Sequence, residues 1–68
     1  MIEEAIRYSL RNKAIINIIY HSSSGITQRK IKVMSIHDET ITAYCYTKKN
    51  IRTFKIESIL GASIEHDF

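Results

Sequence analysis

The sequence predicts a small, mainly β domain with one N-terminal helix. Three observations support this prediction. The chain has 68 residues, which is enough for one domain that spans residues 1–68. Its apolar residues recur with a helical period only near the N-terminus and alternate with a period of two thereafter. Isoleucine is abundant, and β-branched side chains favour strands because they fit a pleated, half-buried surface.

The segment 2–12 is predicted to form a short amphipathic helix. Its apolar and small side chains recur at intervals of three and four residues, so they form one stripe that must pack on the rest of the domain. The stripe consists of Ile2, Ala5, Ile6, Ser9 and Leu10.

Four strands are predicted after the helix, and a short fifth one closes the chain. Both faces of the first strand are largely apolar, so we expect both to be covered. The later strands alternate apolar and polar side chains, which is typical of a sheet with one solvated face. The expected strands are residues 14–20, 27–36, 40–47, 51–59 and 62–68.

Polar turns at residues 21–25, 37–39 and 48–50 separate these strands, and Asn50 is expected to take the left-handed conformation. Gly61 permits a bend before the last strand. One helix and a meander of strands have few ways to hide their apolar faces. We therefore expect a small SH3/Sm-like barrel of four to five antiparallel strands, with the helix over one opening.

Composition and charge restrict the function classes. Residues 5–55 carry all ten Lys and Arg but only two of the seven acidic residues, Asp38 and Glu39, which favours polyanionic partners. Cys45 is the only cysteine, so no intrachain disulfide can form, and its phase predicts a small buried hydrophobe. The chain shows neither an apolar run long enough to cross a membrane nor an export signal, so a cytoplasmic location without a membrane partner is expected.

No catalytic function is predicted. No histidine is spaced to activate Cys45, and the chain has no glycine-rich loop that could cradle a phosphate. The three histidines, His21, His37 and His66, lack the paired spacing of a zinc site. We therefore expect no metal and no cofactor.

Arg29 and Arg52 are the first candidate binding residues. Each precedes apolar residues at a spacing of two in its own strand, so each is directed toward the core side near the beginning of a strand. Because burying an unpaired charge is prohibitive, we expect both guanidinium groups at the rim of the barrel, where they could bind a phosphate bidentately. The alternative is a structural role, in which they pair with Glu57 or Asp38 or cap strand carbonyls.

Aromatic and lysine side chains supply a second set of candidates. Tyr44 and Tyr46 share a face, and tyrosines flanked by lysines are typical of single-strand recognition, in which rings stack on bases. The alternative is that both tyrosines pack under the N-terminal helix. Lys30 and Lys32 also share a face and are expected to keep a strand soluble at its edge. The alternative is that they extend the basic surface. The lysines assigned to the candidate site are Lys48, Lys49 and Lys55.

Several short motifs resemble the WYL domain of bacterial regulators. Residues 43–46, a short turn and residues 51–59 resemble that family's "AY…RTFRLDRI" segment. Upstream, Ala5-Ile6 and residues 16–20 resemble "AI…(L/I)xIxY", and Gly25 with residues 29–33 resembles "G…RxVxP". The resemblance covers almost the whole chain, including the late Phe68. It implies an Sm/SH3-like barrel that senses nucleic acid or nucleotide ligands.

The chain also departs from the family pattern. The tripeptide that gives the family its name is Glu39-Thr40-Ile41 here, Val33 replaces a proline, and Ser58 replaces an arginine that is thought to line the family's binding surface. The helix-turn-helix domain that usually precedes a WYL module has no room in these 68 residues, so a stand-alone minimal module is expected.

The resulting prediction is a non-enzymatic WYL-like module in transcription regulation that binds single-stranded nucleic acid or a nucleotide-type anion. Arg29 and Arg52 would contact the ligand, assisted by Tyr44 and the three lysines. An alternative is a protein-interaction module, a detached sensor subunit or an antagonist of a regulator, that associates through a sheet edge. A homo-oligomer with shared sheet edges is a third hypothesis.

Overall fold

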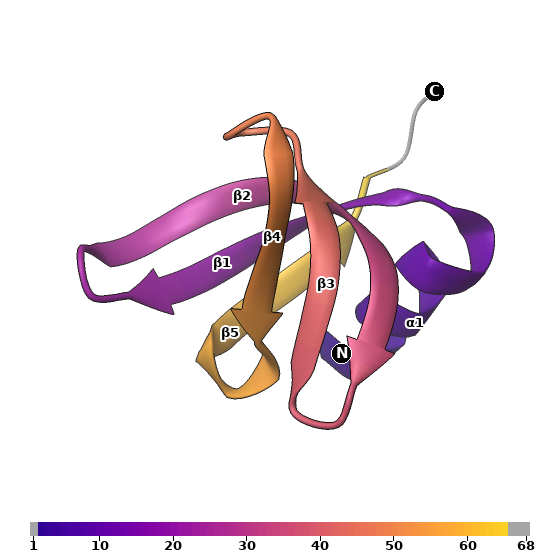
Figure 1. The fold of residues 1–68 in the computed structure, drawn as a ribbon, viewed down its shortest axis with the longest axis horizontal. Coiled ribbons are helices and arrows are strands. Elements are labelled where there is room, and N and C mark those ends of the chain that lie inside the picture. The colour runs from indigo at the N-terminus through magenta and orange to yellow at the C-terminus, as the bar shows by residue number, and fades with distance from the viewer. Residues whose placement is uncertain (1, 66–68) are drawn as a thin grey trace.

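The computed structural model describes residues 2–65, which form one antiparallel sheet and one helix (Figure 1). The strand order is β4-β3-β2-β1-β5, so each strand except β5 pairs with its neighbour in sequence. This arrangement confirms the predicted class of a mainly β domain with a small barrel-like fold. The elements are α1 (Ile2–Asn12), β1 (Ile15–Ser22), β2 (Gly25–His37), β3 (Thr40–Cys45), β4 (Asn50–Lys55), the 3-10 turn η1 (Ile56–Ser58) and β5 (Ile59–Ile64).

Helix α1 has the predicted bounds and ends where Lys13 takes the left-handed conformation, with φ of 52°. Ala5, Ile6 and Ser9 of the predicted stripe are buried. The prediction for Leu10 was wrong, because this side chain is 37% exposed at the margin of the stripe.

Ser9 joins the helix to two strands. Its hydroxyl donates a hydrogen bond to the carbonyl of Ala14 (2.6 Å) and accepts one from the backbone N–H of Val33 (2.9 Å). The backbone N–H of Ala14 also bonds to the carbonyl of Ser9 (3.1 Å). Since Ser9 is fully buried, water cannot replace these partners, and the hydroxyl fixes the position of α1 on the sheet.

The β1–β2 hairpin is longer than the sequence indicated. Its strands pair from Ile15 opposite Lys32 to Ser22 opposite Gly25, and the connecting turn contains two residues. The expectation that both faces of β1 are covered was wrong. Ile16 and Ile18 are fully buried on one face, whereas Ile19 on the other face is 37% exposed.

The remaining connections also differ in detail from the prediction. The left-handed residue of the β3–β4 turn is Lys49, with φ of 57°, and Asn50 already belongs to β4. Strand β4 ends at Lys55 because η1 interrupts the predicted fourth strand. The chain then forms β5 through Gly61, where a bend was expected. Phe68 lies outside the described residues.

The core lies on the inner face of the curled sheet, where α1 closes one end. Ala5 and Ile6 of α1 join a cluster of buried side chains from all five strands. Strand β4 crosses the β1–β2 hairpin on the inner side (Figure 1), and the Phe54 ring meets the Tyr20 ring edge-on at 5.0 Å. The Tyr20 hydroxyl also accepts a hydrogen bond from the backbone N–H of Lys55 (3.3 Å).

We predict that Ser9→Ala lowers the free energy of unfolding by about 2 kcal/mol. The substitution removes the hydroxyl that is hydrogen-bonded to the backbone N–H of Val33 and to the carbonyl of Ala14. A buried polar group that loses its partner costs about 1–3 kcal/mol. Urea unfolding followed by circular dichroism measures the change. Ser63→Ala is the matched control, because Ser63 is exposed on β5, and equal midpoints for the two variants would contradict the prediction.

Candidate anion-binding site

Arg29 and Arg52 lie on the inner face of the sheet. Arg29 pairs with the fully buried Ile18 across the β1–β2 ladder, and Arg52 pairs with the fully buried Ala43 across β3–β4. Because side chains of paired residues point to the same face, both arginines point to the side that carries the core. Arg29 is half-buried and Arg52 is exposed, so the pair extends from the core to solvent.

A neighbour two residues earlier in the same strand holds each guanidinium group. Nε of Arg29 donates to the Thr27 hydroxyl (3.2 Å), and Nε of Arg52 donates to the Asn50 side-chain oxygen (3.2 Å). Both groups therefore lean toward the start of their strands and keep their terminal nitrogens for other acceptors. Strands β2 and β4 run in the same direction because each is antiparallel to β3, so the two arginines lean toward the same end of the sheet.

Arg29 carries an unsatisfied donor. Its Nη1 atom is buried and has no hydrogen-bond partner among residues 2–65. The guanidinium carbon lies 6.0 Å from the centre of the Phe54 ring, which is at the outer limit of a cation–π contact. We call the group formed by Arg29, Arg52 and Phe54, with Thr27 and Asn50 behind the arginines, the arginine site.

The described part of the chain does not neutralise these cations. Its one ion pair joins Lys30 to Glu65, with Nζ and Oε1 3.0 Å apart. The alternative in which Glu57 or Asp38 pairs with an arginine is therefore not found within residues 2–65. Four acidic side chains, Glu3, Asp38, Glu39 and Glu57, line one hollow at the opposite end of the sheet.

The other candidate residues divide between two places. Lys48 and Lys49 are exposed in the β3–β4 turn, at the end toward which the arginines lean. Tyr44 lies on the outer face, because its neighbours Ala43 and Cys45 fill the inner one. Lys55 lies on the outer face at the far end of β4, where it pairs with Thr40. The structure thus brings Arg29, Arg52, Lys48 and Lys49 to one end of the sheet, and places Tyr44 and Lys55 elsewhere.

Two expectations about these side chains were wrong. Helix α1 packs on the inner face, so Tyr44 and Tyr46 do not lie under it. Strand β2 is the central strand of the sheet, so Lys30 and Lys32 do not protect an edge.

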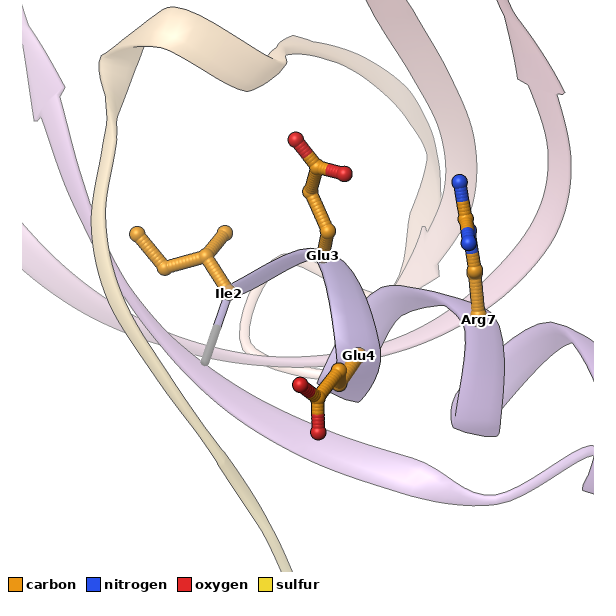
Figure 2. Close-up of a pocket in the computed structure, with 4 residues that line it drawn as sticks. All are labelled: Ile2, Glu3, Glu4 and Arg7. Carbon is orange, nitrogen blue, oxygen red and sulfur yellow. The ribbon is translucent and has the colours of Figure 1, made fainter.

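A hollow of about 670 Å³ lies beside the first turn of α1, away from the arginine site (Figure 2). Figure 2 shows Glu3 and Arg7 pointing in the same direction from α1, whereas Glu4 points to the opposite side of the helix. Acidic, basic and apolar side chains of a single helix turn line this hollow, and they do not converge on a common point. Such an arrangement offers little specificity for a ligand.

No catalytic arrangement is visible in residues 2–65. Cys45 is fully buried, as predicted. The Ser35 hydroxyl lies 3.0 Å from Nε2 of His37, but both atoms belong to the exposed end of β2 and the pair lines none of the hollows described above. Within the same residues, no three His, Cys, Asp or Glu side chains are placed to hold a metal ion. No helix in this part of the chain is long and apolar enough to cross a membrane.

Thr27, Asn50 and Phe54 belong to the site but were not predicted from the sequence. A signal for the first two was present, since a side-chain acceptor two residues before an arginine shares its face in a strand. Phe54 is one of the apolar residues that follow Arg52 at a spacing of two, which predicts that it faces inward. Its contact with Arg29 depends on how β4 crosses the hairpin, which local sequence does not specify.

Comparisons with known proteins support the fold. No protein-family model and no curated protein sequence matches the chain. Among solved structures, proteasome accessory factor B/C (PafBC) of Arthrobacter aurescens matches 96% of this chain, with a TM-score of 0.81 and 21% sequence identity. The chain spans only 11% of the length of that protein. At this level of identity the match establishes a shared fold, and it supports the WYL-like fold that the sequence motifs imply.

Proposed function

We propose that the chain is a non-enzymatic, WYL-like regulatory module that binds a nucleotide-type anion at the arginine site. The observation that carries this proposal is the buried Nη1 of Arg29, which has no partner within residues 2–65. A phosphate group supplies acceptors with the geometry of a guanidinium fork, and it would pair this donor and the free nitrogens of Arg52.

Energetics favour a ligand over a purely structural role. A buried donor without an acceptor costs about 1–3 kcal/mol. A domain of this size has a net stability of about 3–5 kcal/mol, so the cost is a large fraction of the total. A bound anion would remove it, and a ligand that binds only the folded state would stabilise the domain further as its concentration rises above the dissociation constant.

The surroundings favour a ligand that carries more than one phosphate. Lys48 and Lys49 lie at the same end of the sheet as the arginines and are exposed. They could contact a second phosphate of a nucleoside diphosphate. Phe54 is 2% exposed, so its ring supports Arg29 and is not free to stack on a base. The affinity of this site for a nucleotide would therefore come mainly from contacts to its phosphate groups.

The regulatory role is supported by the motifs shared with WYL domains and by the fold shared with part of PafBC. Ser58 stands where the WYL pattern has an arginine, at the end of η1. The arginine site as proposed does not use this position, because Arg29 and Arg52 already supply two forks.

We predict that adenosine diphosphate binds the full chain and that Arg52→Gln weakens binding about 10- to 150-fold. The expected loss is that of a hydrogen-bonded pair between charged groups, about 1.5–3 kcal/mol. Isothermal titration calorimetry at low salt measures the affinity, and inorganic phosphate serves as a second ligand. Arg11→Gln is the matched control, because Arg11 is exposed in the last turn of α1. An equal loss in both variants would mean that only net charge matters, and an absence of binding to either ligand would refute the site.

We predict that Arg29→Met changes the free energy of unfolding by less than about 1 kcal/mol in phosphate-free buffer while it abolishes nucleotide binding. Methionine keeps the apolar contact with Phe54 and removes the unsatisfied Nη1 donor, and the lost cation–π contact and Thr27 hydrogen bond offset this gain. Urea unfolding measures the change. Destabilisation by more than about 2 kcal/mol would show that the guanidinium group has a structural role instead.

A second candidate function, association through a sheet edge, is favoured by the topology. Within residues 2–65, β4 and β5 are the outer strands of the sheet, and each has one edge without a strand partner. Such edges can add a strand from another chain.

Multi-angle light scattering over a range of concentrations tests this function. If the edges mediate self-association, the mass exceeds that of the 7.9 kDa monomer and returns to it on dilution. A mass equal to that of the monomer at every concentration would exclude self-association.

A further inference from the structure

A hollow of about 290 Å³ lies between the C-terminal end of α1 and β2. The β1–β2 ladder ends where Lys32 pairs with Ile15, and the next residue of β2 bonds to α1 instead, through the hydroxyl of Ser9. The helix therefore replaces β1 as the neighbour of β2 at this point. We call the hollow the helix-end groove, and its lining residues are Leu10, Lys13, Lys32, Val33 and Met34.

Two large apolar side chains of this groove are incompletely covered. Leu10 belongs to the helical stripe whose spacing predicts burial, yet it is 37% exposed. The β2–β3 register shifts between Val33 and Ser35, so Met34 lies opposite no residue of β3. Such a bulge redirects the side chain that it carries, and Met34 is 50% exposed. Apolar surface from two different elements is therefore open to a partner at one place.

The walls of the groove are fixed before any partner binds. The Ser9 hydroxyl accepts the backbone N–H of Val33, and the Ser9 carbonyl accepts that of Ala14, so the end of the helix is held against β2. Val33 is 3% exposed and forms the floor. A preformed groove requires little ordering on binding, and the unbranched side chain of Met34 can adapt to the shape of a partner.

Positive charge flanks the open apolar surface. Lys13 and Lys32 line the groove, whereas no Asp or Glu does. The one ion pair within residues 2–65 joins Lys30 to Glu65, so neither groove lysine has a carboxylate partner in that part of the chain. A partner that carries carboxylates complements this charge. The same groove of a second copy would instead bring lysines against lysines.

From this combination we propose that the helix-end groove binds an acidic, amphipathic segment of a partner protein. An aliphatic side chain of the segment packs against Leu10 and Met34, and the carboxylates beside it pair with Lys13 and Lys32. A nucleic acid offers phosphates to the lysines but no aliphatic side chain to the apolar surface. The arginine site offers charge without open apolar surface, because Phe54 is 2% exposed. The proposal does not depend on the anion proposed for that site.

Fluorescence anisotropy of the full chain with a short labelled peptide, in which glutamates surround one leucine, tests the proposal. Replacing the leucine of the peptide by alanine should weaken binding by about 10-fold, because less apolar surface is then buried. Replacing its glutamates by glutamines should also weaken binding and should remove the salt dependence. Both comparisons leave the protein unchanged, so they do not depend on how well a variant folds.

Met34→Gln tests the apolar part of the groove. It should weaken binding of the leucine peptide by about 3- to 13-fold, because the exposed half of a methionine side chain is what a partner can bury. Leu60→Gln is the matched control, since Leu60 is 54% exposed and also lies at a register shift, that between β5 and β1. Circular dichroism checks that both variants are folded. Equal effects of the two substitutions would overturn the proposal.

Lys13→Glu tests the charged part. It replaces attraction by repulsion and should weaken binding by about 2- to 30-fold, which corresponds to one surface ion pair lost and one repulsive pair gained. Lys55→Glu is the charge-matched control, because Lys55 is exposed at the far end of β4 and does not line the groove. An equal loss in both variants would mean that only net charge matters and would overturn the proposal.

Nuclear magnetic resonance locates the bound peptide. The largest shifts of backbone amides are expected at the five residues that line the groove, and shifts confined to residues 27–29 and 50–54 would overturn the proposal in favour of the arginine site. Equal affinities for the leucine and alanine peptides, or no binding of either, would overturn it too. Tighter binding of laurate than of the peptide would overturn it in favour of a lipid.

The groove and the arginine site can fail separately. Met34→Gln should leave the affinity for adenosine diphosphate unchanged, because Met34 is not part of the arginine site. If the nucleotide binds and the peptide does not, only the helix-end groove is refuted. If the peptide binds with dependence on Met34 and the nucleotide does not bind, only the arginine site is refuted.

Discussion

Side-chain contacts, not a ladder of backbone hydrogen bonds, hold β4 across the β1–β2 hairpin. Within residues 2–65, β4 and β5 are the two ends of the strand order, so no strand pairing closes the barrel. The closing contacts are the Phe54 ring, which packs edge-on against the Tyr20 ring, and the backbone N–H of Lys55, which donates a hydrogen bond to the Tyr20 hydroxyl. The approach of Arg29 to Phe54 depends on these contacts, because the two residues belong to β2 and β4, which do not pair in the sheet.

The direction of the strands separates charge along the sheet. Because β2 and β4 run the same way, their arginines and the lysine turn collect at one end, whereas the β2–β3 turn and η1 bring carboxylates to the other. The alternation of side chains along each strand also places different kinds of side chain on the two faces of the sheet. The guanidinium groups of Arg29 and Arg52 lie on the inner face, and the paired rings of Tyr44 and Tyr46 lie on the outer one.

Local periodicity was sufficient to predict α1, the phase of the first four strands and the burial of Cys45. It could not predict which face α1 covers, because alternation defines two faces without saying which one meets the helix. The Tyr44–Tyr46 pair was therefore identified as a pair but placed wrongly in the alternative under the helix. The interruption at η1 was also missed. Residues 51–59 alternate without a Gly or Pro, so nothing local indicates that the chain leaves the sheet after Lys55 to reach β1. The contact of Arg29 with Phe54 joins residues far apart in sequence and depends on the whole closure of the barrel.

The magnitudes at Arg29 decide between a structural and a functional role. A cation–π contact at 6.0 Å is worth about 0.5–1 kcal/mol at a partly exposed site, and the Nε bond to Thr27 is worth about 1 kcal/mol net. The unsatisfied Nη1 donor costs about 1–3 kcal/mol, so these contributions approximately cancel. An apolar side chain of similar length would serve folding equally well at this position. It could not supply a guanidinium group that Thr27 already orients and whose terminal nitrogens are free. A second guanidinium group, that of Arg52, is held by Asn50 on the same face of the sheet. Two arginines prepared in the same way, without a carboxylate partner in residues 2–65, fit an anion that the protein does not itself contain.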